Sequence, residues 1–248
     1  MVEVSAQDYS TDYTIESVYS RKNTLLRPPL CNVDQIVVVI APVPKPDFLL
    51  IDKLIINARM MGIDVILVVN KSDISSIFDE VCEEYKWVAS HIIETSAYSK
   101  KGVDTLVQLL KGKFSCFVGQ SAVGKSTLLN AICPNIQAET GGLSKKIERG
   151  KNTTRHSEIY SFEDILIADT PGFSLYDLDI NFEEIKDYYP ELLIDTPCKY
   201  LNCNHVSEGD SECAVIRAVN NGLINRNRYD RYKDLFVLTK EKWQNKYR

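Results

Sequence analysis

The segment Gly119–Ser126 has the residue types and spacing of a phosphate-binding loop, because it matches the pattern G-x-x-x-x-G-K-[ST] in full. An apolar segment precedes it and a segment with helical spacing follows, whereas a glycine-rich turn without a ligand needs neither. The glycines let backbone N–H groups converge on phosphate oxygens at a helix N-terminus. We expect Lys125 to reach the β- and γ-phosphates and Ser126 to ligate Mg²⁺. The predicted nucleotide-binding residues of this loop are Gly119, Gln120, Ser121, Ala122, Val123, Gly124, Lys125, Ser126 and Thr127.

A second motif, Asn70-Lys71-Ser72-Asp73, follows another apolar segment and has the residues needed to read guanine. The N1–H and the exocyclic amine of guanine require a pair of acceptors, which the Asp73 carboxylate supplies and which adenine does not need. We expect Asn70 to support the loop and the Lys71 side chain to lie against the base. Taken alone, the motif is also compatible with a helix N-cap at Ser72 or Asp73.

Two further segments extend the nucleotide site. Thr95-Ser96-Ala97 resembles the second base-contacting loop of GTPases, in which the Ala97 N–H meets guanine O6. Asp169-Thr170-Pro171-Gly172 has the D-x-x-G spacing of switch II. We predict that Asp169 holds Mg²⁺ through water and that the Gly172 N–H senses the γ-phosphate. Together with the first two motifs, these segments predict guanine binding.

The segment Asn152–His156 lies between the phosphate loop and D-x-x-G, where switch I belongs. We favour Thr154 over Thr153 for the contact with Mg²⁺ and the γ-phosphate. Phe173 follows D-x-x-G, where Ras-like GTPases carry the glutamine that orients the attacking water, so unassisted hydrolysis is expected to be slow. His156 is our candidate for orienting that water; the alternatives are a surface histidine or an RNA contact.

The order of these motifs is permuted, because the base-reading loops precede the phosphate loop and both switches. Joining the usual termini, through Gly102–Lys113, would restore an ordinary GTPase sheet, since circular permutation is tolerated where termini lie close together. Apolar runs alternating with helical spacing predict an α/β fold, a P-loop NTPase-like and mostly parallel sheet with helices on both faces. The expected strands are Gln35–Ala41, Asp64–Val69, Phe114–Val118 and Asp164–Ala168, and the expected helices are Asp47–Met61, Ile74–Lys86, Val103–Leu110 and Lys125–Ile132.

Three cysteines and a histidine crowd together after the predicted sheet, at Cys198, Cys203, His205 and Cys213. Thiolates with one imidazole suit a closed, tetrahedral, structural Zn²⁺ site. A small domain with few apolar residues needs such a metal site to stabilise its fold. The alternative is a set of free buried cysteines. The remaining four are expected to pack as small hydrophobic side chains: Cys31, Cys82, Cys116 and Cys133.

The composition sets the class of protein. With 248 residues, 44% hydrophobic and 25% charged, the chain is an ordinary globular protein rather than a disordered or collagenous one. No apolar run approaches the ~20 residues of a membrane span and no signal peptide is evident, so we expect a protein of the cytoplasm or an organelle matrix, without a membrane partner. No exposed apolar repeat suggests a dimer interface, which favours a monomer. The formal charge is −5, yet residues 221–248 are basic, which favours either phosphate contacts or a solvated helix face.

The permuted order resembles one family, the circularly permuted, ribosome small-subunit-dependent GTPases (RsgA, also called YjeQ). The resemblance rests on Gly119–Thr127, Thr153-Thr154-Arg155-His156, Asp169–Phe173 and the Cys/His cluster. It implies a bacterial or organellar GTPase that binds the small ribosomal subunit and its rRNA during late assembly, with GTP hydrolysis stimulated by the subunit.

The same resemblance predicts the domain organisation. We expect a remnant of an N-terminal OB-fold with a linker at 1–32, a GTPase domain at 33–178 and a zinc-binding helical domain at 179–248. Two other classes of function stay open. One is a GTP-gated RNA- or ribosome-binding module with incidental hydrolysis. The other is a P-loop kinase or ATPase, which would leave Asn70–Asp73 unexplained.

Overall fold

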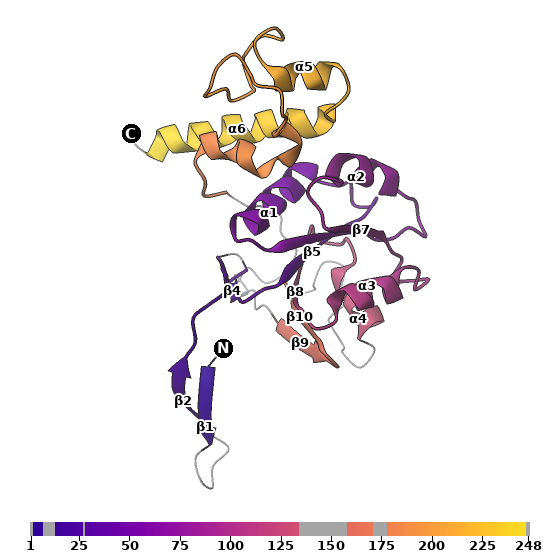
Figure 1. Cartoon of the computed structure of the whole chain (residues 1–248). Coiled ribbons are helices and arrows are strands. Elements are labelled where there is room, and N and C mark those ends of the chain that lie inside the picture. The colour runs from indigo at the N-terminus through magenta and orange to yellow at the C-terminus, as the bar shows by residue number, and fades with distance from the viewer. Residues whose placement is uncertain (1, 7–12, 27, 134–157, 171–177, 247–248) are drawn as a thin grey trace, which may run out of the picture.

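The centre of the molecule is a six-stranded sheet with the strand order β7-β6-β5-β8-β10-β9 (Figure 1). The computed structural model describes residues 2–6, 13–26, 28–133, 158–170 and 178–246. Every neighbouring pair is parallel except β10 and β9, which are antiparallel. The strands are β5 (Gln35–Ile40), β6 (Asp64–Val69), β7 (His91–Glu94), β8 (Phe114–Val118), β9 (Glu158–Phe162) and β10 (Ile165–Asp169).

The four predicted strands are confirmed, with ends shifted by at most one residue at β5 and β10. Two strands were not predicted. β7 is short and only partly buried, and β9 is a largely exposed edge strand. Edge strands bury little apolar surface, so neither carries the continuous apolar run that identifies a central parallel strand.

The helices follow the predicted ranges except at one end. The helices of this part are α1 (Phe48–Met60), α2 (Phe78–Tyr85), α3 (Val103–Leu110) and α4 (Lys125–Ile132). The prediction that the second helix begins at Ile74 is wrong, because the Ile74 N–H donates to the Lys71 carbonyl in a turn. The Ser76 hydroxyl then accepts from the Phe78 N–H, so that side chain, not a helical turn, precedes α2.

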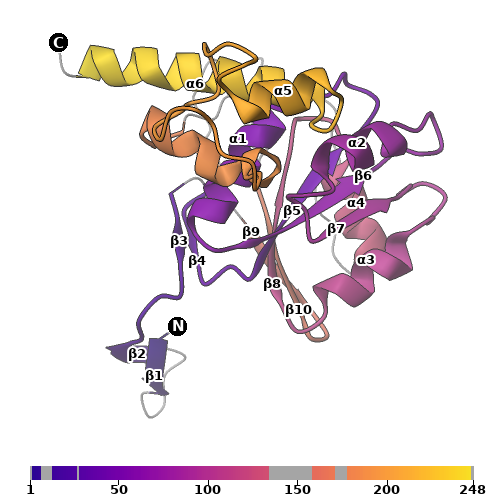
Figure 2. The ribbon, with the colours of Figure 1, turned by 45° about the horizontal axis from the view of Figure 1, so that its top comes forward.

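Alternating side chains of the strands divide the core between the two faces of the sheet. In β5, Val37 and Val39 belong to an apolar cluster that includes α3 and α4. Val38 and Ile40 belong to a second cluster, which includes α1, α2 and the C-terminal helices. Helices therefore cover both faces, as predicted, and the C-terminal part lies on the α1 side (Figure 2).

Between residues 178 and 246 the regular secondary structure is helical, and no strand occurs among these described residues. It comprises two 3-10 helices, η2 (Phe182–Tyr188) and η3 (Pro190–Leu192), followed by α5 (Ala214–Asn220) and α6 (Arg226–Lys246). The long α6 packs against η2 and α1 (Figure 1). None of the helices in the described residues combines the length and apolar composition needed to cross a membrane.

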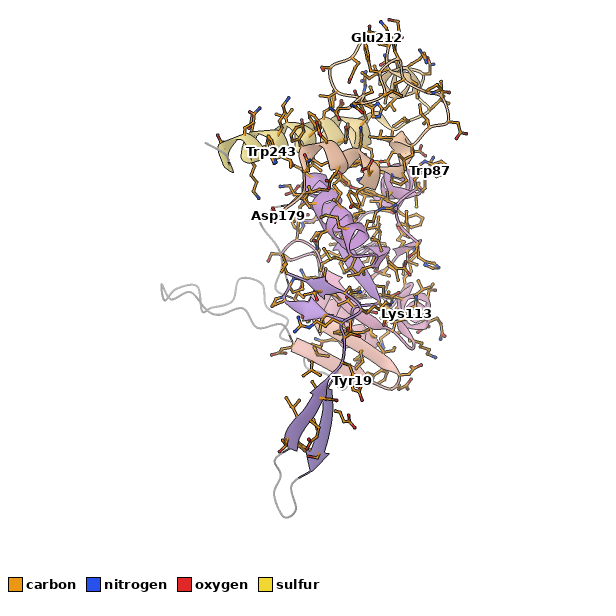
Figure 3. All side chains as sticks on the ribbon, turned by 60° about the vertical axis from the view of Figure 1, so that its left-hand side comes forward. Tyr19, Trp87, Lys113, Asp179, Glu212 and Trp243 are labelled. Carbon is orange, nitrogen blue, oxygen red and sulfur yellow. The ribbon has the colours of Figure 1, made fainter. Side chains whose placement is uncertain are left out.

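The described N-terminal residues form two small antiparallel pairs that the sequence did not predict. β3 (Thr24–Leu25) pairs with β4 (Leu30–Cys31) beside the sheet domain, and Leu25 joins its apolar cluster. β1 (Val2–Ala6) pairs with β2 (Tyr13–Val18) in a hairpin that extends away from the body, with Tyr19 at its base (Figure 3). The domain boundary expected near residue 32 stays a prediction.

Candidate nucleotide-binding site and metal centre

The phosphate loop connects β8 to α4, and its glycines are required by close contacts. Gly119 has a φ of 141°, and a Cβ there would collide with the Val39 carbonyl oxygen of the neighbouring strand. Gly124 has a φ of 95°, and its Cβ would lie 2.5 Å from the Asn70 side-chain nitrogen. The loop can therefore lie against the strand and the base-reading loop only with glycine at both positions. Ser121, Ala122 and Thr127 are exposed.

Lys125 begins α4 and is 7% exposed. Its Nζ donates to the carbonyl oxygens of Gly119 (3.0 Å) and Gln120 (2.8 Å), so the ammonium lies over the loop. Burial disfavours the charged form and lowers the pKa of Lys125 to about 8, although the nearby Asp169 carboxylate opposes the shift. A cation held this way is available to an anion that can replace the loop carbonyls.

Asp169 ends β10, directly beside β8, and faces the first turn of α4. The Ser126 hydroxyl lies 3.5 Å from its Oδ2, while its buried Oδ1 has no hydrogen-bond partner among the described residues. Burial raises the pKa of Asp169, and the Lys125 charge opposes the shift. Thr170 anchors the strand end, because its hydroxyl donates to the Phe117 carbonyl at 2.7 Å. A carboxylate with an unpartnered oxygen beside a hydroxyl fits the oxygen ligands that Mg²⁺ prefers.

Asn70 joins the base-reading loop to the phosphate loop. It is 1% exposed, and its Nδ2 donates to the Val123 carbonyl at 3.1 Å. Its Oδ1 accepts from the Thr95 hydroxyl and the Ala97 N–H, both at 3.2 Å. One amide therefore holds three loops, and the Thr95 contribution was not predicted from the sequence.

Lys71 forms a second connection between the same loops. Its Nζ donates to the Ala122 carbonyl at 2.7 Å and to the Val43 carbonyl at 2.8 Å. The side chain thus crosses above the phosphate loop, as expected of a residue that lies along a base. Ser72 has a buried hydroxyl without a partner, and its N–H donates to the Thr95 carbonyl at 3.1 Å.

Asp73 is oriented by the other base-contacting loop. The Ser96 hydroxyl donates to Asp73 Oδ1 at 2.5 Å and accepts from the Ser99 N–H at 3.1 Å. Among the described residues, no side chain forms a hydrogen bond with the second carboxylate oxygen of Asp73. The described residues predicted for the nucleotide site follow β6, β7 and β8 or end β10, so they lie at the carboxyl ends of parallel strands of one sheet, where open α/β sheets bind ligands.

Sequence reasoning missed one segment of this site, the loop between β5 and α1. Gln120 of the phosphate loop accepts from the Asp47 N–H at 2.9 Å and donates to the Lys45 carbonyl at 3.3 Å. Asp47 in turn caps α1, since its Oδ1 accepts from the Leu50 N–H at 2.9 Å. An N-cap aspartate before an apolar helix is a readable signal for the cap, but not for its contact with Gln120.

The remaining switch residues lie outside the described part of the chain. The predictions for Thr153, Thr154, His156, Gly172 and Phe173 therefore stay predictions.

The four predicted metal ligands converge. The ligand atoms of Cys198, Cys203, His205 and Cys213 all lie within 4.8 Å of one another. The Cys198 Sγ is 3.8 Å from the Cys213 Sγ and 3.6 Å from the His205 Nδ1, close to the ~3.8 Å edge of a tetrahedron with 2.3 Å metal–sulfur bonds. The set is compatible with a zinc site. The other four cysteines are free, with Cys116 and Cys133 buried and Cys31 and Cys82 half-buried.

Together, the sheet order, the loop after β8 and the earlier base-reading loops define a circularly permuted P-loop GTPase with a Cys/His cluster near its C-terminus. The profile of the RsgA GTPase family matches residues 18–179. The chain belongs to this family and is a GTP hydrolase.

Relatives agree over most of the chain. The small ribosomal subunit biogenesis GTPase RsgA of Ruminiclostridium cellulolyticum is 40% identical over 233 residues, 92% of this chain and 75% of the relative. The protein of the same name from Caldanaerobacter subterraneus subsp. tengcongensis is 37% identical over 254 residues, 100% of this chain and 85% of the relative.

Two solved structures share the fold. The crystal structure of YjeQ from Thermotoga maritima has a TM-score of 0.79 and 35% identity, covering 96% of this chain and 82% of that chain. The crystal structure of YloQ, described as a circularly permuted GTPase, has a TM-score of 0.76 and 30% identity, covering 97% and 79%.

Proposed function

We propose that this protein binds the small ribosomal subunit and hydrolyses GTP to GDP and phosphate during late subunit assembly, with the subunit stimulating hydrolysis. Relatives 37–40% identical over most of the chain are named as small ribosomal subunit biogenesis GTPases. The observation that best supports a guanine-nucleotide site is the direct hydrogen bonding of Asn70 and Lys71, in the base-reading loop, to the phosphate loop.

The described residues have distinct roles in this proposal. Asp73 accepts from guanine N1–H and the exocyclic amine, positioned by the Ser96 hydroxyl. The Ala97 N–H, which donates to Asn70 Oδ1 in this structure, is shared between that oxygen and guanine O6 when the base binds. When phosphate binds, the Lys125 ammonium donates to phosphate oxygens in place of the Gly119 and Gln120 carbonyls. The negative charge of the phosphate then favours the charged form of this buried lysine. The backbone N–H groups of the phosphate loop surround the β-phosphate.

Ser126 and Asp169 hold Mg²⁺ in this proposal, the carboxylate acting through water. The buried Oδ1 of Asp169, which lacks a hydrogen-bond partner, supports this assignment. Magnesium supplies neutralisation of the charge that develops on the β- and γ-phosphate oxygens. Thr154 and the Gly172 N–H complete the γ-phosphate contacts, and His156 orients the attacking water. With Phe173 in place of the water-orienting glutamine, unstimulated turnover is near the ~10⁻⁴ s⁻¹ of unassisted Ras.

The remaining parts of the chain support docking. We propose a GTPase domain at 33–178 and a C-terminal domain at 179–248, built around one structural Zn²⁺ held by Cys198, Cys203, His205 and Cys213. The exposed basic residues of α6, among them Arg226 and Lys240, contact rRNA phosphates, since exposed lysine and arginine release counterions from nucleic acid. The protein acts as a monomer in the cytoplasm.

GTP turnover with and without purified small ribosomal subunits, at fixed Mg²⁺ and fixed salt, tests the proposal. Stimulation of about a hundredfold or more supports a subunit-activated enzyme, since activating partners supply roughly 10³–10⁵ to other GTPases. Tight GTP binding without stimulation would instead support a GTP-gated binding module. Preference for ATP over GTP in competition would refute the guanine assignment.

A further inference from the structure

The loop that carries two of the proposed metal ligands is held by side chains from other elements. The Lys186 Nζ of η2 donates to the Cys203 carbonyl at 3.1 Å. From α6, the Tyr232 hydroxyl donates to the Asn204 carbonyl and the Tyr229 hydroxyl donates to the His205 carbonyl at 2.8 Å. Three consecutive carbonyl groups of the loop therefore each accept a hydrogen bond from outside it.

Glu208 satisfies the N–H groups of the same loop. Its Oε1 accepts from the Asn204 N–H at 3.1 Å, and its Oε2 accepts from the N–H groups of Val206 (2.8 Å) and Ser207 (3.1 Å). The loop needs this support, because His205 has a φ of 56°, in the left-handed region that a histidine adopts only at a cost. The loop geometry is thus imposed by hydrogen bonds to backbone groups, and the ligand atoms of the Cys203 and His205 side chains take no part in them.

The neighbouring residues of α6 bind the GTPase part of the molecule. Arg228 donates to Asp52 of α1 through Nη1, and its Nε donates to Glu191 of η3 at 2.7 Å. Arg231 donates to the other oxygen of Asp52 at 2.7 Å and to Glu84 of α2 at 2.6 Å. Asp52 is fully buried and accepts from both arginines.

These contacts fix α6 in position. The Arg228 guanidinium lies 4.8 Å from the ring centroid of Tyr85 and 4.3 Å from that of Tyr189. Both tyrosine hydroxyl groups also donate to Asp52, at 2.6 Å and 3.3 Å. Because residues three apart share a helix face, Arg228 and Arg231 face α1 and α2 while Tyr229 and Tyr232 face the metal loop.

We propose that Tyr229 and Tyr232 are positioning residues of the metal site and that the segment Arg228–Tyr232 joins this site to α1 in one cooperative unit. The inference rests on the proposed zinc site. Since a ligand that binds only the folded form stabilises everything that unfolds with its site, zinc occupancy stabilises α1 of the GTPase domain as well as the loop.

Hydrogen–deuterium exchange of the full-length protein, with and without a zinc chelator, tests the cooperative unit. At zinc concentrations 100 times the dissociation constant, occupancy slows the shared opening about 100-fold. Chelation should therefore accelerate exchange in both 198–213 and α1, while α3 and α4, on the other face of the sheet, stay unchanged. Faster exchange confined to 198–213 would overturn the inference, and this result needs no variant.

Two variants and one control test whether α6 connects the metal site to α1. Tyr229→Phe combined with Tyr232→Phe removes both hydroxyl donors, keeps both rings and should weaken zinc binding about 10- to 100-fold in a chelator competition. Tyr200→Phe is the matched control, because the Tyr200 hydroxyl bonds the Glu212 side chain and not the loop backbone. Asp52→Asn should abolish the response of α1 to chelation while leaving the response of 198–213.

The outcomes separate the two proposals. A wild-type protein that retains no zinc would refute the metal site itself. Wild-type protein with one zinc, together with a double variant of wild-type zinc affinity, would refute the positioning role alone. An α1 response that persists undiminished in Asp52→Asn would refute the route through α6.

Discussion

Replacing Asn70 with alanine removes the amide that joins three loops of the nucleotide site. The side chain makes three hydrogen bonds, to Val123, Thr95 and Ala97, and is almost fully buried. At ~1 kcal/mol for each net hydrogen bond, the change costs about 3 kcal/mol. For a chain of this size, that loss lowers the melting temperature by roughly 6–12 °C.

Nucleotide binding should weaken as well, because binding must then order loops that Asn70 holds in place beforehand. Each 1.4 kcal/mol corresponds to a factor of ten in affinity. If all of the ~3 kcal/mol is lost from the binding free energy, GDP affinity falls about 100-fold, and if half of it is lost, about tenfold. Titration with a fluorescent GDP analogue measures the affinity, and thermal unfolding without nucleotide measures the stability.

Asn220→Ala is the matched control, since Asn220 lies at the end of α5 and its amide bonds the exposed Asp210. This variant should change GDP affinity and melting temperature little. A GDP affinity of Asn70→Ala within twofold of wild type would refute the reasoning. Asn70 would then stabilise the fold without preparing the loops for nucleotide.

Three other changes test single parts of the site. Asp73→Asn should shift base preference from guanosine to xanthosine nucleotides, because an amide donor replaces a carboxylate acceptor; an unchanged preference for GTP over XTP would contradict the assignment. Cys203→Ser should release about one zinc per chain and destabilise the C-terminal domain. Metal analysis and thermal unfolding would detect these changes, and unaltered metal content would contradict the proposed zinc site. Burial lowers the pKa of Lys125 in the free protein to about 8, whereas bound phosphate favours the charged lysine. Above that pH, GDP binding is therefore accompanied by uptake of a proton by Lys125, and the affinity for GDP falls as the pH rises. Affinity should fall about fourfold between pH 7 and pH 8.5, and a flat profile would contradict the lowered pKa of the buried Lys125.

The core of the nucleotide site could be predicted from the sequence because its determinants are local. A phosphate loop requires Gly119, Gly124 and Lys125 at fixed spacing, and the helix after the loop begins at Lys125, as predicted. The base-reading motif follows an apolar run that became β6. The cluster from Cys198 to Cys213 spans sixteen residues, so its convergence is also a local property.

Edges and helix starts were less predictable. β9 and β7 lack continuous apolar runs because edge strands need to bury only part of their surface. α2 begins four residues later than its periodicity indicates, since Ser76 bonds the Phe78 N–H and the chain before it forms a turn at the base-reading loop. In these places side-chain hydrogen bonds outweighed helical propensity.

The proposed nucleotide loops, the spacing of the four proposed metal ligands and the permuted order could be predicted because residues close together in the chain set them. Which charges are buried, and which groups they bind, depends on contacts between distant parts of the chain. Asp52 stands in an apolar helix without any sign of its role, and its partner Arg231 lies 179 residues away. A buried carboxylate is stable only with its cationic partners in place, and helix spacing alone does not identify a partner at that separation.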